Sequence, residues 1–384
     1  MTGQRSLGRI SARLGERSGG ATPARVGRAT PATPVRVMLV DDSHVVRAIL
    51  ERILLTDGRF SVVASCTRAD EALRFLERGE ADVALLDLEM PGMHGADAIP
   101  QLIALAPAMR ILILSANCAE GGVAAIEALA RGAHDTLLKP GGGATFAGSF
   151  GKVLTGRIAA LANTPAPEAV PLQPLPAAPH VELGGIGAIG VGASTGGIAA
   201  LHALLAALPR DLPVPLFVTQ HLPTTFMHFF ADQLSRATGR RTYVADDGMR
   251  AEANGIYVAA GGAHLRVMQT AAGPRILLDR QPVPSGILPS VDPMFASLAE
   301  TYGSGALGVL LSGMGRDGLD GARKIASAGG QLLAQDSASS VVWGMPGAIA
   351  AAGLARAILP PHGLGRLITA ALARGISTSA EAAA

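Results

Sequence analysis

Short apolar runs alternate with helix-compatible stretches along this 384-residue chain, and they do so in two separate series. The first series opens with the apolar run 35–40, and an amphipathic stretch follows it at 44–55. Continuous apolar runs of this length are typical of strands that helices cover on both faces, as in parallel sheets. Four more strands are expected, each after a helix, at 61–66, 82–87, 110–115 and 135–139. This alternation predicts a doubly wound α/β domain over residues 35–155.

A proline-rich segment ends the first series. Residues 163–180 contain six prolines and almost no charge. Proline has no backbone N–H and a fixed φ, so this segment cannot form a helix or an interior strand. We expect a semi-extended Pro/Ala-rich linker over residues 156–183.

The second series predicts another parallel α/β domain, over residues 184–376. Its strands are expected at 186–191, 214–220, 306–312 and 331–335. Between the second and the third of these strands, residues 241–282 are rich in glycine and contain the short runs GIYVAA, HLRVM and RILLD. Short β-like runs separated by glycine indicate a β-hairpin insertion in the otherwise parallel sheet.

Composition and charge exclude several kinds of partner. The formal net charge is +2 and no long basic face is evident outside the N-terminus, so nucleic acid is not predicted as a partner. No apolar run reaches the roughly 18 to 20 residues that a membrane-spanning helix needs, so membrane insertion is not expected. The two cysteines, Cys66 and Cys118, lie in no CxxC or Cys/His cluster, which predicts reduced thiols in the cytoplasm.

Polar residues at the ends of the first strands predict a metal site. Asp41 and Asp42 follow the first strand, Asp87 ends the third, Ser115 ends the fourth and Lys139 ends the fifth. In an open parallel sheet these strand ends meet at one edge. Three carboxylates gathered there repel one another unless a hard cation lies between them, and Mg²⁺ suits such oxygen ligands.

The same arrangement predicts phosphorylation. Asp87 can attack a phosphoryl group to form an aspartyl phosphate, and the Lys139 ammonium and the Ser115 hydroxyl are placed to bind its oxygens. A single aspartate after a strand is more often a helix cap than a ligand. The joint arrangement therefore carries the prediction, and no one of these residues does so alone.

Residues 35 to about 155 resemble the receiver domain of two-component response regulators. The resemblance implies a flavodoxin-like fold with a five-stranded parallel sheet. It also implies that Asp87 is the phosphoacceptor for a sensor histidine kinase, and that Ser115 and Lys139 relay the change. A cis peptide bond at Lys139–Pro140 is implied as well.

The segment GASTGG at 192–197 follows a predicted strand and precedes an Ala/Leu-rich helix. As a dinucleotide-binding glycine loop it is imperfect, because Gly196 is displaced by one position and Asp211 precedes the next strand instead of ending it. As G-x-S-x-G it is a strand-to-helix elbow, which exposes Ser194 where helix N–H groups can stabilise an oxyanion. As a simple helix start it would use Ser194 only as the N-cap.

Two other residues favour the elbow. A serine nucleophile needs a base, and the base needs a carboxylate that orients it. His221 ends the next strand and Asp317 follows the strand at 306–312, so all three side chains are expected at one edge of one sheet. The chain order Ser–His–Asp differs from the Ser–Asp–His of α/β-hydrolases. Structural roles are expected for three other histidines, His202, His228 and His264.

These segments resemble the chemotaxis protein-glutamate methylesterases. The similar motifs cover nearly all of 186–355, and they are GASTGG, TQHLP, LPSVDPMF, LSGMGRDG and WGMPGAI. The resemblance implies a Rossmann-like, doubly wound catalytic domain in which Ser194 is the nucleophile, His221 the general base and acid, and Asp317 the group that orients His221. It implies no cofactor for ester hydrolysis. Thr195 and Met314 are candidates for backbone oxyanion donors, and a structural turn role is the alternative for both.

The family resemblance also implies the substrate and its regulation. The substrate is a glutamyl methyl ester on the cytoplasmic helices of a methyl-accepting chemoreceptor, and many members also deamidate receptor glutamines. The unphosphorylated receiver domain is expected to cover the active site, and phosphorylation is expected to uncover it.

Two positions depart from the family patterns. Receivers usually have an aromatic residue three positions before the lysine, where this chain has Thr136, so the rotamer switch is expected to be altered. Relatives commonly have arginine before the Pro-Ser-Val-Asp run, where this chain has Leu288, which puts receptor preference in doubt.

Two functions of other classes remain open. The second domain could only bind a receptor or another partner, as a pure signalling module. It could also be a nicotinamide-dependent oxidoreductase, which a cofactor-binding titration would separate from a hydrolase. The presence of Ser194, His221 and Asp317 together favours the hydrolase.

Both ends of the chain differ from the two domains. Residues 1–34 contain six arginines and one acidic residue, Glu16. Such starts can be organellar transit peptides, but the bacterial character of the domains favours a disordered tail or a start codon assigned too early. A second disordered tail is expected at 377–384.

Overall fold

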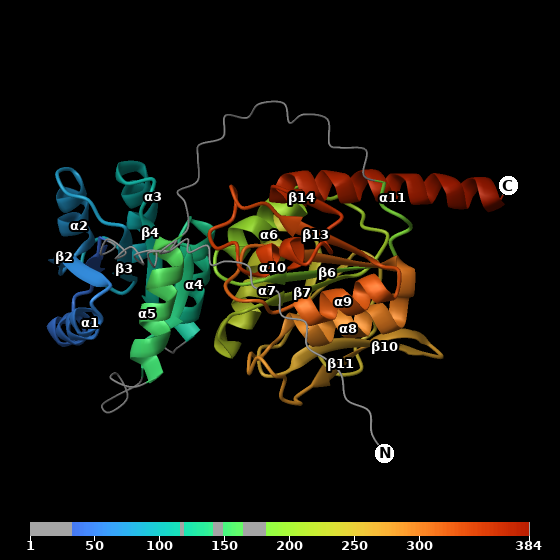
Figure 1. Ribbon diagram of the computed structural model, residues 1–384, viewed down its shortest axis with the longest axis horizontal. Helices are drawn as coiled ribbons and strands as arrows, with labels where there is room; N and C mark the ends of the chain where they lie inside the picture. The colour runs from blue at the N-terminus through green and yellow to red at the C-terminus, as the bar shows by residue number, and fades with distance from the viewer. Residues whose placement is uncertain (1–32, 116–118, 141–148, 164–181, 384) are drawn as a thin grey trace, which may run out of the picture. The chain divides into compact units, whose positions relative to one another are not determined.

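The first five strands form one parallel sheet in the computed structural model, which describes residues 33–115, 119–140, 149–163 and 182–383 (Figure 1). The strand order is β2-β1-β3-β4-β5, which is the predicted flavodoxin-like topology. The strands are β1 (Val35–Val40), β2 (Phe60–Cys66), β3 (Val83–Asp87), β4 (Arg110–Ser115) and β5 (Asp135–Leu138). The helices are α1 (His44–Thr56), α2 (Ala69–Leu76), α3 (Gly95–Leu105), α4 (Ala119–Ala130) and α5 (Ser149–Ala162).

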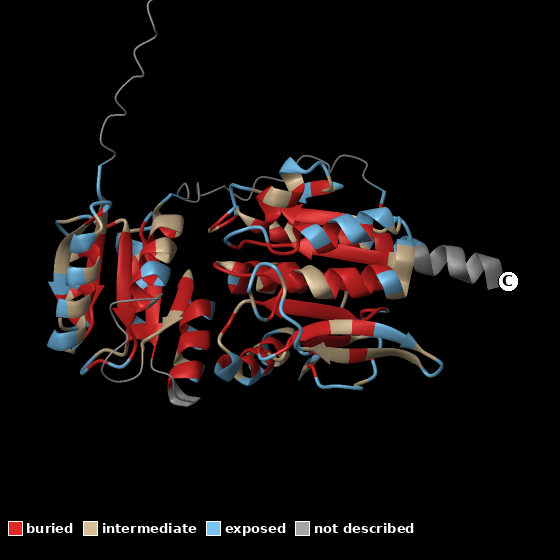
Figure 2. Cartoon of the chain, turned by 60° about the horizontal axis from the view of Figure 1, so that its bottom comes forward, coloured by how far each residue is buried: buried red, intermediate tan, exposed pale blue. Residues whose placement is uncertain are grey.

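Alternate residues of these strands pack on opposite faces of the sheet. Val37 and Leu39 of β1 share a core with residues of α1 and α5. Met38 and Val40, which point the other way, share a core with residues of α2, α3 and α4. This two-sided burial explains why the strands are continuous apolar runs, and Figure 2 shows them as buried between more exposed helices.

The second sheet has seven strands in the order β14-β13-β12-β6-β7-β9-β8, and every pairing within it is parallel. The predicted doubly wound architecture is therefore confirmed. Its strands are β6 (Ala188–Ala193), β7 (Leu216–Gln220), β8 (Arg241–Val244), β9 (Gly255–Val258), β12 (Ala306–Leu310), β13 (Gln331–Gln335) and β14 (Ala357–Leu359). Its helices are α6 (Gly197–Ala206), η1 (Thr224–Phe226), α7 (Met227–Thr238), α8 (Val291–Tyr302), η2 (Gly303–Gly305), α9 (Leu319–Ser327), α10 (Met345–Ala351) and α11 (Pro361–Ala383).

The strand order places a topological switch point in each sheet. The chain leaves β1 toward β2 on one side and returns to β3 on the other, so a crevice opens between the carboxyl ends of β1 and β3. In the second sheet the reversal lies between β6 and β12, since β7 is the other neighbour of β6. Both predicted sites lie at these reversals.

The predicted hairpin insertion over 241–282 is only partly right. Strands β10 (His264–Thr270) and β11 (Gly273–Asp279) form an antiparallel two-stranded sheet, as expected for HLRVM and RILLD. The GIYVAA run instead contributes β9 to the main sheet, where it pairs in parallel with β7 and β8. All four residues of β9 are buried, so this run suits an interior position between two strands and not an exposed hairpin.

Three other expectations need correction. Helix α5 continues to Ala162, so residues 156–162 are helical and do not belong to the linker. Helix α11 continues to Ala383, because the alanine-rich end of the chain favours helix and not the predicted disordered tail at 377–384. Within the described ranges one peptide bond is cis, Leu288–Pro289, so the expected cis bond at Lys139–Pro140 is wrong.

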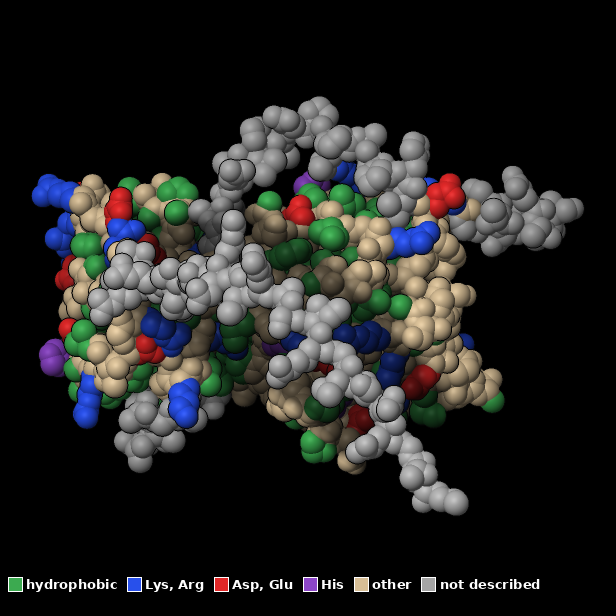
Figure 3. All heavy atoms as spheres, viewed as in Figure 1, with side chains coloured by type: hydrophobic (Ala, Val, Ile, Leu, Met, Phe, Trp, Pro, Cys, Tyr) green, Lys and Arg blue, Asp and Glu red, His purple; other side chains and the backbone are tan. Residues whose placement is uncertain are grey.

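The described helices include none that is both long enough and apolar enough to span a membrane. On the face shown in Figure 3, basic and acidic side chains are interspersed among hydrophobic and neutral ones. Cys66 is buried, and burial raises the pKa of its thiol to about 11. Cys118, most of the predicted linker and all but the last two residues of the predicted tail at 1–34 lie outside the described residues.

Candidate functional site

Ser194 lies in a sharp turn between β6 and α6. The turn depends on Gly196, whose φ is +74° and whose added Cβ would lie 2.4 Å from Cβ of Val341. Gly196 is also the N-cap of α6, which begins at Gly197. Ser194 is therefore not the helix cap, and the reading of this serine as a simple cap is wrong. No hydrogen bond of its Oγ is recorded among the described residues.

Hydrogen bonds with β7 and with the segment that follows β12 hold this turn. The amide of Ser194 donates to the carbonyl of Ser312 at 3.0 Å. Gln220 Nε2 donates to the carbonyl of Ser194 at 2.9 Å, and Ser312 Oγ donates to the carbonyl of Thr195 at 2.7 Å. Gln220 and Ser312 were not predicted as site residues from the sequence, although Gln220 lies in the TQHLP motif and Ser312 in the strand expected at 306–312.

His221 and Asp317 form a buried pair at the same sheet edge. His221 Nε2 lies 2.8 Å from Asp317 Oδ2, and Asp317 is 4% exposed. The backbone of His221 is fixed beside the serine, because its amide donates to the carbonyl of Ala193 at 3.0 Å. Since Nε2 faces the carboxylate, Nδ1 is the imidazole nitrogen that remains for Ser194.

The carboxylate of Asp317 is stabilised in its charged form. Burial alone would raise the pKa of Asp317, but hydrogen bonds from His221, Ser290 and Val291 outweigh burial and lower it below its usual value. Ser290 Oγ donates to Oδ1 at 2.5 Å, and the Val291 amide donates to Oδ2 at 2.7 Å. The lowered pKa favours an ionised Asp317, which is what an imidazolium at His221 requires beside it.

Ser194 and His221 line one cavity of about 480 Å³. Met314, Leu222 and Leu288 contribute apolar surface to it. The structure records no Ser194–His221 hydrogen bond among the described residues, and in enzymes without substrate such bonds are often long. The cavity gives the serine and the imidazole a common space that can hold a small ester group.

Two backbone amides beside the cavity are available as donors. Within the described chain, no hydrogen-bond partner is recorded for the amide of Thr195 or for that of Met314. Thr195 is buried next to the serine, and Met314 lines the same cavity. Amides without a protein partner fit the expected oxyanion donors.

Asp292 lies beside Asp317, and its pKa is shifted in the opposite direction. Burial, together with the negative charges of Asp317 and Asp320, raises the pKa of Asp292 to about 6. The Gly321 amide donates to Asp292 Oδ1 at 2.7 Å but does not offset this shift. An ionised Asp292 therefore costs free energy in the folded protein that it does not cost in the unfolded chain.

We expect Asp292→Asn to stabilise the protein at pH 7.5 and hardly at all at pH 4. The folded state holds the Asp292 proton more tightly than the unfolded state, so the wild-type chain loses stability as pH rises through about 6. A pKa shift of this size corresponds to at most about 3 kcal/mol, and solvent screening of this half-buried group lowers the expected gain to about 1 kcal/mol. Unfolding midpoints across this pH range check this, and a gain independent of pH would contradict it.

The predicted metal ligands converge at the edge of the first sheet. One oxygen each from Asp41, Asp42 and Asp87 lies within 4.8 Å of the others. Lys139 Nζ lies 2.8 Å from Asp41 Oδ2 and 2.8 Å from Asp87 Oδ2. Burial and the charge of Asp41 raise the pKa of Asp87, although Lys139 opposes them. Three carboxylates this close together, one of them with a raised pKa, fit a divalent cation, whose charge would relieve the repulsion.

Ser115 also lies where the sequence analysis expected it. It ends β4, is buried, and its Oγ lies 3.5 Å from Oγ1 of Thr136 on β5. Thr136 itself is buried. The position at which receivers usually have an aromatic side chain is therefore filled by a hydroxyl in contact with Ser115.

Strand β5 connects this region to the serine turn within the unit Pro34–Ala384. Thr195 Oγ1 donates to Asp135 Oδ2 at 2.5 Å, and the Gly196 amide donates to the carbonyl of His134 at 2.7 Å. Asp135 also pairs with Arg157 of α5. The cavity at Ser194 is lined in part by residues of the first domain, which are Thr136, Leu137, Leu138, Lys152, Val153, Gly156 and Arg157.

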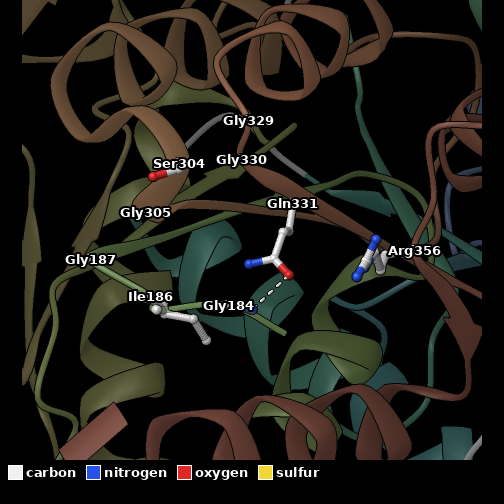
Figure 4. A pocket seen from close by; sticks show the side chains of 10 residues that line it. Gly184, Ile186, Gly187, Ser304, Gly305, Gly329, Gly330, Gln331 and Arg356 are labelled. Atoms are coloured by element: carbon white, nitrogen blue, oxygen red, sulfur yellow. Dashed lines mark hydrogen bonds between the residues drawn. The ribbon is translucent and has the colours of Figure 1, made fainter. Parts of the chain in front are cut away.

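A second hollow, of about 660 Å³, lies at the opposite edge of the second sheet (Figure 4). It is lined by the residues that precede β6, β12 and β13, most of them glycines. Gln331 and Arg356 project from its wall, and Gln331 Oε1 accepts the Gly184 amide at 3.0 Å. Because it lies at the amino ends of the strands, it includes none of the predicted site residues.

Comparison with known proteins identifies the family. The CheB methylesterase model matches residues 189–368, and the response regulator receiver domain model matches residues 37–146. The protein-glutamate methylesterase/protein-glutamine glutaminase of Azospirillum brasilense is 38% identical over an alignment of 376 residues, which covers 90% of this chain and 95% of that protein. The chain belongs to this family.

Other protein-glutamate methylesterases are similar to the same extent. Protein-glutamate methylesterase/protein-glutamine glutaminase 2 of Caulobacter vibrioides is 40% identical over an alignment of 352 residues, which covers 89% of this chain and all of that protein. Among solved structures, the Thermotoga maritima CheB methylesterase catalytic domain is 32% identical, with a TM-score of 0.46. The match covers 48% of this chain and 97% of the Thermotoga chain. Membership makes this chain a carboxylic ester hydrolase with a receiver domain, and it overturns the oxidoreductase and pure signalling alternatives.

Proposed function

We propose that this enzyme removes methyl groups from glutamyl methyl esters of chemoreceptor cytoplasmic helices and deamidates receptor glutamines, under the control of phosphorylation at Asp87. The observation that carries the proposal is the buried His221–Asp317 pair, with Nε2 and Oδ2 2.8 Å apart, beside Ser194 in one cavity. Its relatives are named for both activities. Because the substrate segments are cytoplasmic, we place the enzyme in the cytoplasm.

The residues support an acyl-enzyme route. Ser194 Oγ attacks the ester carbonyl carbon while His221 takes the hydroxyl proton, and the Thr195 and Met314 amides bind the resulting oxyanion. When the intermediate collapses, the methoxy group leaves with the proton from His221 as methanol. Water then attacks the acyl-enzyme with His221 as the base, which releases the glutamate side chain and restores Ser194. For a glutamine substrate, ammonia is the group that leaves.

We further propose that the acidic cluster is the phosphorylation site. Asp41, Asp42 and Asp87 would hold Mg²⁺, which neutralises charge on the incoming phosphoryl group. An oxygen of Asp87 forms the bond to phosphorus as the bond to the histidine kinase breaks, and Lys139 and Ser115 bind the phosphoryl oxygens.

Regulation is proposed to act through β5 and α5. The contacts of Asp135 with Thr195 and Arg157 connect the serine turn to the receiver, and residues of both elements line the cavity. We propose a receiver domain from residue 35 to the end of α5, a linker to residue 183, and a catalytic domain over 184–376. In the unphosphorylated chain the receiver restricts access to Ser194, and phosphorylation weakens these contacts.

Methanol release from methylated receptor membranes tests the proposal. We expect the full chain to release methanol slowly, and faster when a small acyl phosphate and Mg²⁺ phosphorylate the receiver. A fragment of residues 182–384 should release methanol at the faster rate without either addition, because it lacks the restricting domain. No release by the full chain or by the fragment would contradict the esterase proposal. Equal rates for fragment and unphosphorylated chain would contradict only the restriction by the receiver.

A further inference from the structure

Asp317 lies in a turn and is held in place by another part of the chain. Its carboxylate accepts hydrogen bonds from Ser290 Oγ at 2.5 Å and from the Val291 amide at 2.7 Å. Ser290 is the N-cap of α8, and its Oγ also accepts the Asp292 amide at 3.2 Å. The first turn of α8 therefore supplies two of the groups that orient the carboxylate toward His221.

His264, at the start of β10, holds this first turn of α8 in its position. Its Nδ1 accepts the Ser290 amide at 3.0 Å, and its Nε2 lies 3.0 Å from the carbonyl oxygen of Gln281. Because Nδ1 accepts a hydrogen bond, Nδ1 carries no proton. The ring proton therefore lies on Nε2, which donates a hydrogen bond to the carbonyl oxygen of Gln281. His264 is 1% exposed and Ser290 is fully buried. Both ring nitrogens are therefore used within the protein, in one fixed tautomer.

We propose that His264 is a positioning residue for ester hydrolysis, which fixes Ser290 so that Ser290 Oγ and the Val291 amide hold Asp317 against His221. His264 is not among the residues that line the cavity at Ser194, so it acts only through Ser290 and Asp317. This role replaces the purely structural one that was expected for His264 from the sequence. The inference rests on the proposed esterase function.

The physical reason is that the buried N–H group of Ser290 needs a hydrogen-bond acceptor. In the described structure the Ser290 amide has His264 Nδ1 as its recorded partner, and a buried donor without a partner is costly. If Nδ1 is removed, the segment must move to find another acceptor, and Ser290 Oγ moves with it. A displacement of about 1 Å in a catalytic group can lower the rate about 100-fold.

Two substitutions separate this role from simple packing. Asparagine places its Oδ1 near the position of Nδ1, so His264→Asn keeps an acceptor for the Ser290 amide. Glutamine places its terminal amide near Nε2, so His264→Gln keeps only the bond to Gln281. We expect kcat of the full chain to fall about 10- to 100-fold in the Gln variant, with KM nearly unchanged, and to stay within about threefold in the Asn variant. His202→Gln is the matched control, because His202 bonds Gln233 instead of any of these residues.

A double-mutant cycle with Asp317→Asn gives the decisive readout. If His264 acts through the Asp317 carboxylate, His264→Gln should cost little further rate once that carboxylate is gone. Equal losses in the Asn and Gln variants, or the same loss in both backgrounds, would overturn the inference. Absence of methanol release by the wild-type chain would instead contradict the esterase proposal.

The tautomer offers a test that does not depend on any variant folding. In the wild-type chain labelled with ¹⁵N-histidine, His264 should give the nitrogen shifts of a neutral imidazole with the proton on Nε2. A proton on Nδ1 would overturn the inference, because Nδ1 could not then accept the Ser290 amide.

Discussion

Replacing Ser194 with alanine should lower kcat for methanol release by about six orders of magnitude. Loss of the nucleophile or the base of a serine protease triad has an effect of about this size, because the remaining turnover comes only from oxyanion stabilisation and binding. The unfolding midpoint should hardly change, since Ser194 caps no helix and no hydrogen bond of its Oγ is recorded in the described structure. A surface or cavity side chain without such bonds contributes within about 0.5 kcal/mol.

His221→Ala is the matched companion of Ser194→Ala and should be about as severe. The double variant should be no slower than either single variant, because the serine and the imidazole act as one unit. Measuring kcat and the unfolding midpoint on the same preparations separates chemistry from folding. A Ser194→Ala protein with full activity, or losses that multiply in the double variant, would contradict the acyl-enzyme route.

Asp87→Asn should abolish phosphoryl incorporation from a small acyl phosphate, while hydrolysis stays at its unstimulated level. The amide oxygen cannot form a stable bond to phosphorus, and the substitution also removes one of the three carboxylates of the cluster. Chelation of Mg²⁺ from the wild-type chain should stop incorporation as well. Radiolabel retained on the protein and methanol release, measured in parallel, check both parts of the prediction.

Asp70→Asn serves as the control for this substitution. Asp70 pairs with Arg68 and Arg74 on the surface of the same domain and lies outside the acidic cluster. It should incorporate phosphoryl groups as the wild-type chain does. Stable labelling of Asp87→Asn, or equal loss in Asp70→Asn, would contradict the assignment of Asp87 as the phosphoacceptor.

Local pattern determined much of the fold. The apolar runs at 35–40, 110–115 and 331–335 form strands with the expected bounds. They could be predicted because a strand that helices cover on both faces is apolar along most of its length. The places of Asp87, Ser194 and Asp317 could also be predicted, because the carboxyl ends of parallel strands always share one edge of the sheet.

Helix ends and partners of short strands were less predictable. Proline predicts where a helix cannot continue, but α5 runs to Ala162 because nothing before the prolines stops it. The β9 run could have joined a hairpin or the main sheet, since four apolar residues fit both. The position of β9 was decided by its pairing with β7 and β8, and this pairing joins residues that are distant in sequence.

For the site too, some features could be predicted from the sequence and others could not. The sequence alone determined which residues could be the nucleophile, the base and the orienting carboxylate, because each ends or follows a strand in a recognisable motif. Only the tertiary structure decided that His221 uses Nε2 for Asp317, that Ser290 Oγ donates to that carboxylate, and that His264 Nδ1 accepts the Ser290 amide. Ser290 is 27 residues from Asp317 and 26 from His264 in the chain. Hydrogen bonds across such separations leave no periodic pattern, because they form only when β10, α8 and the turn after β12 pack together.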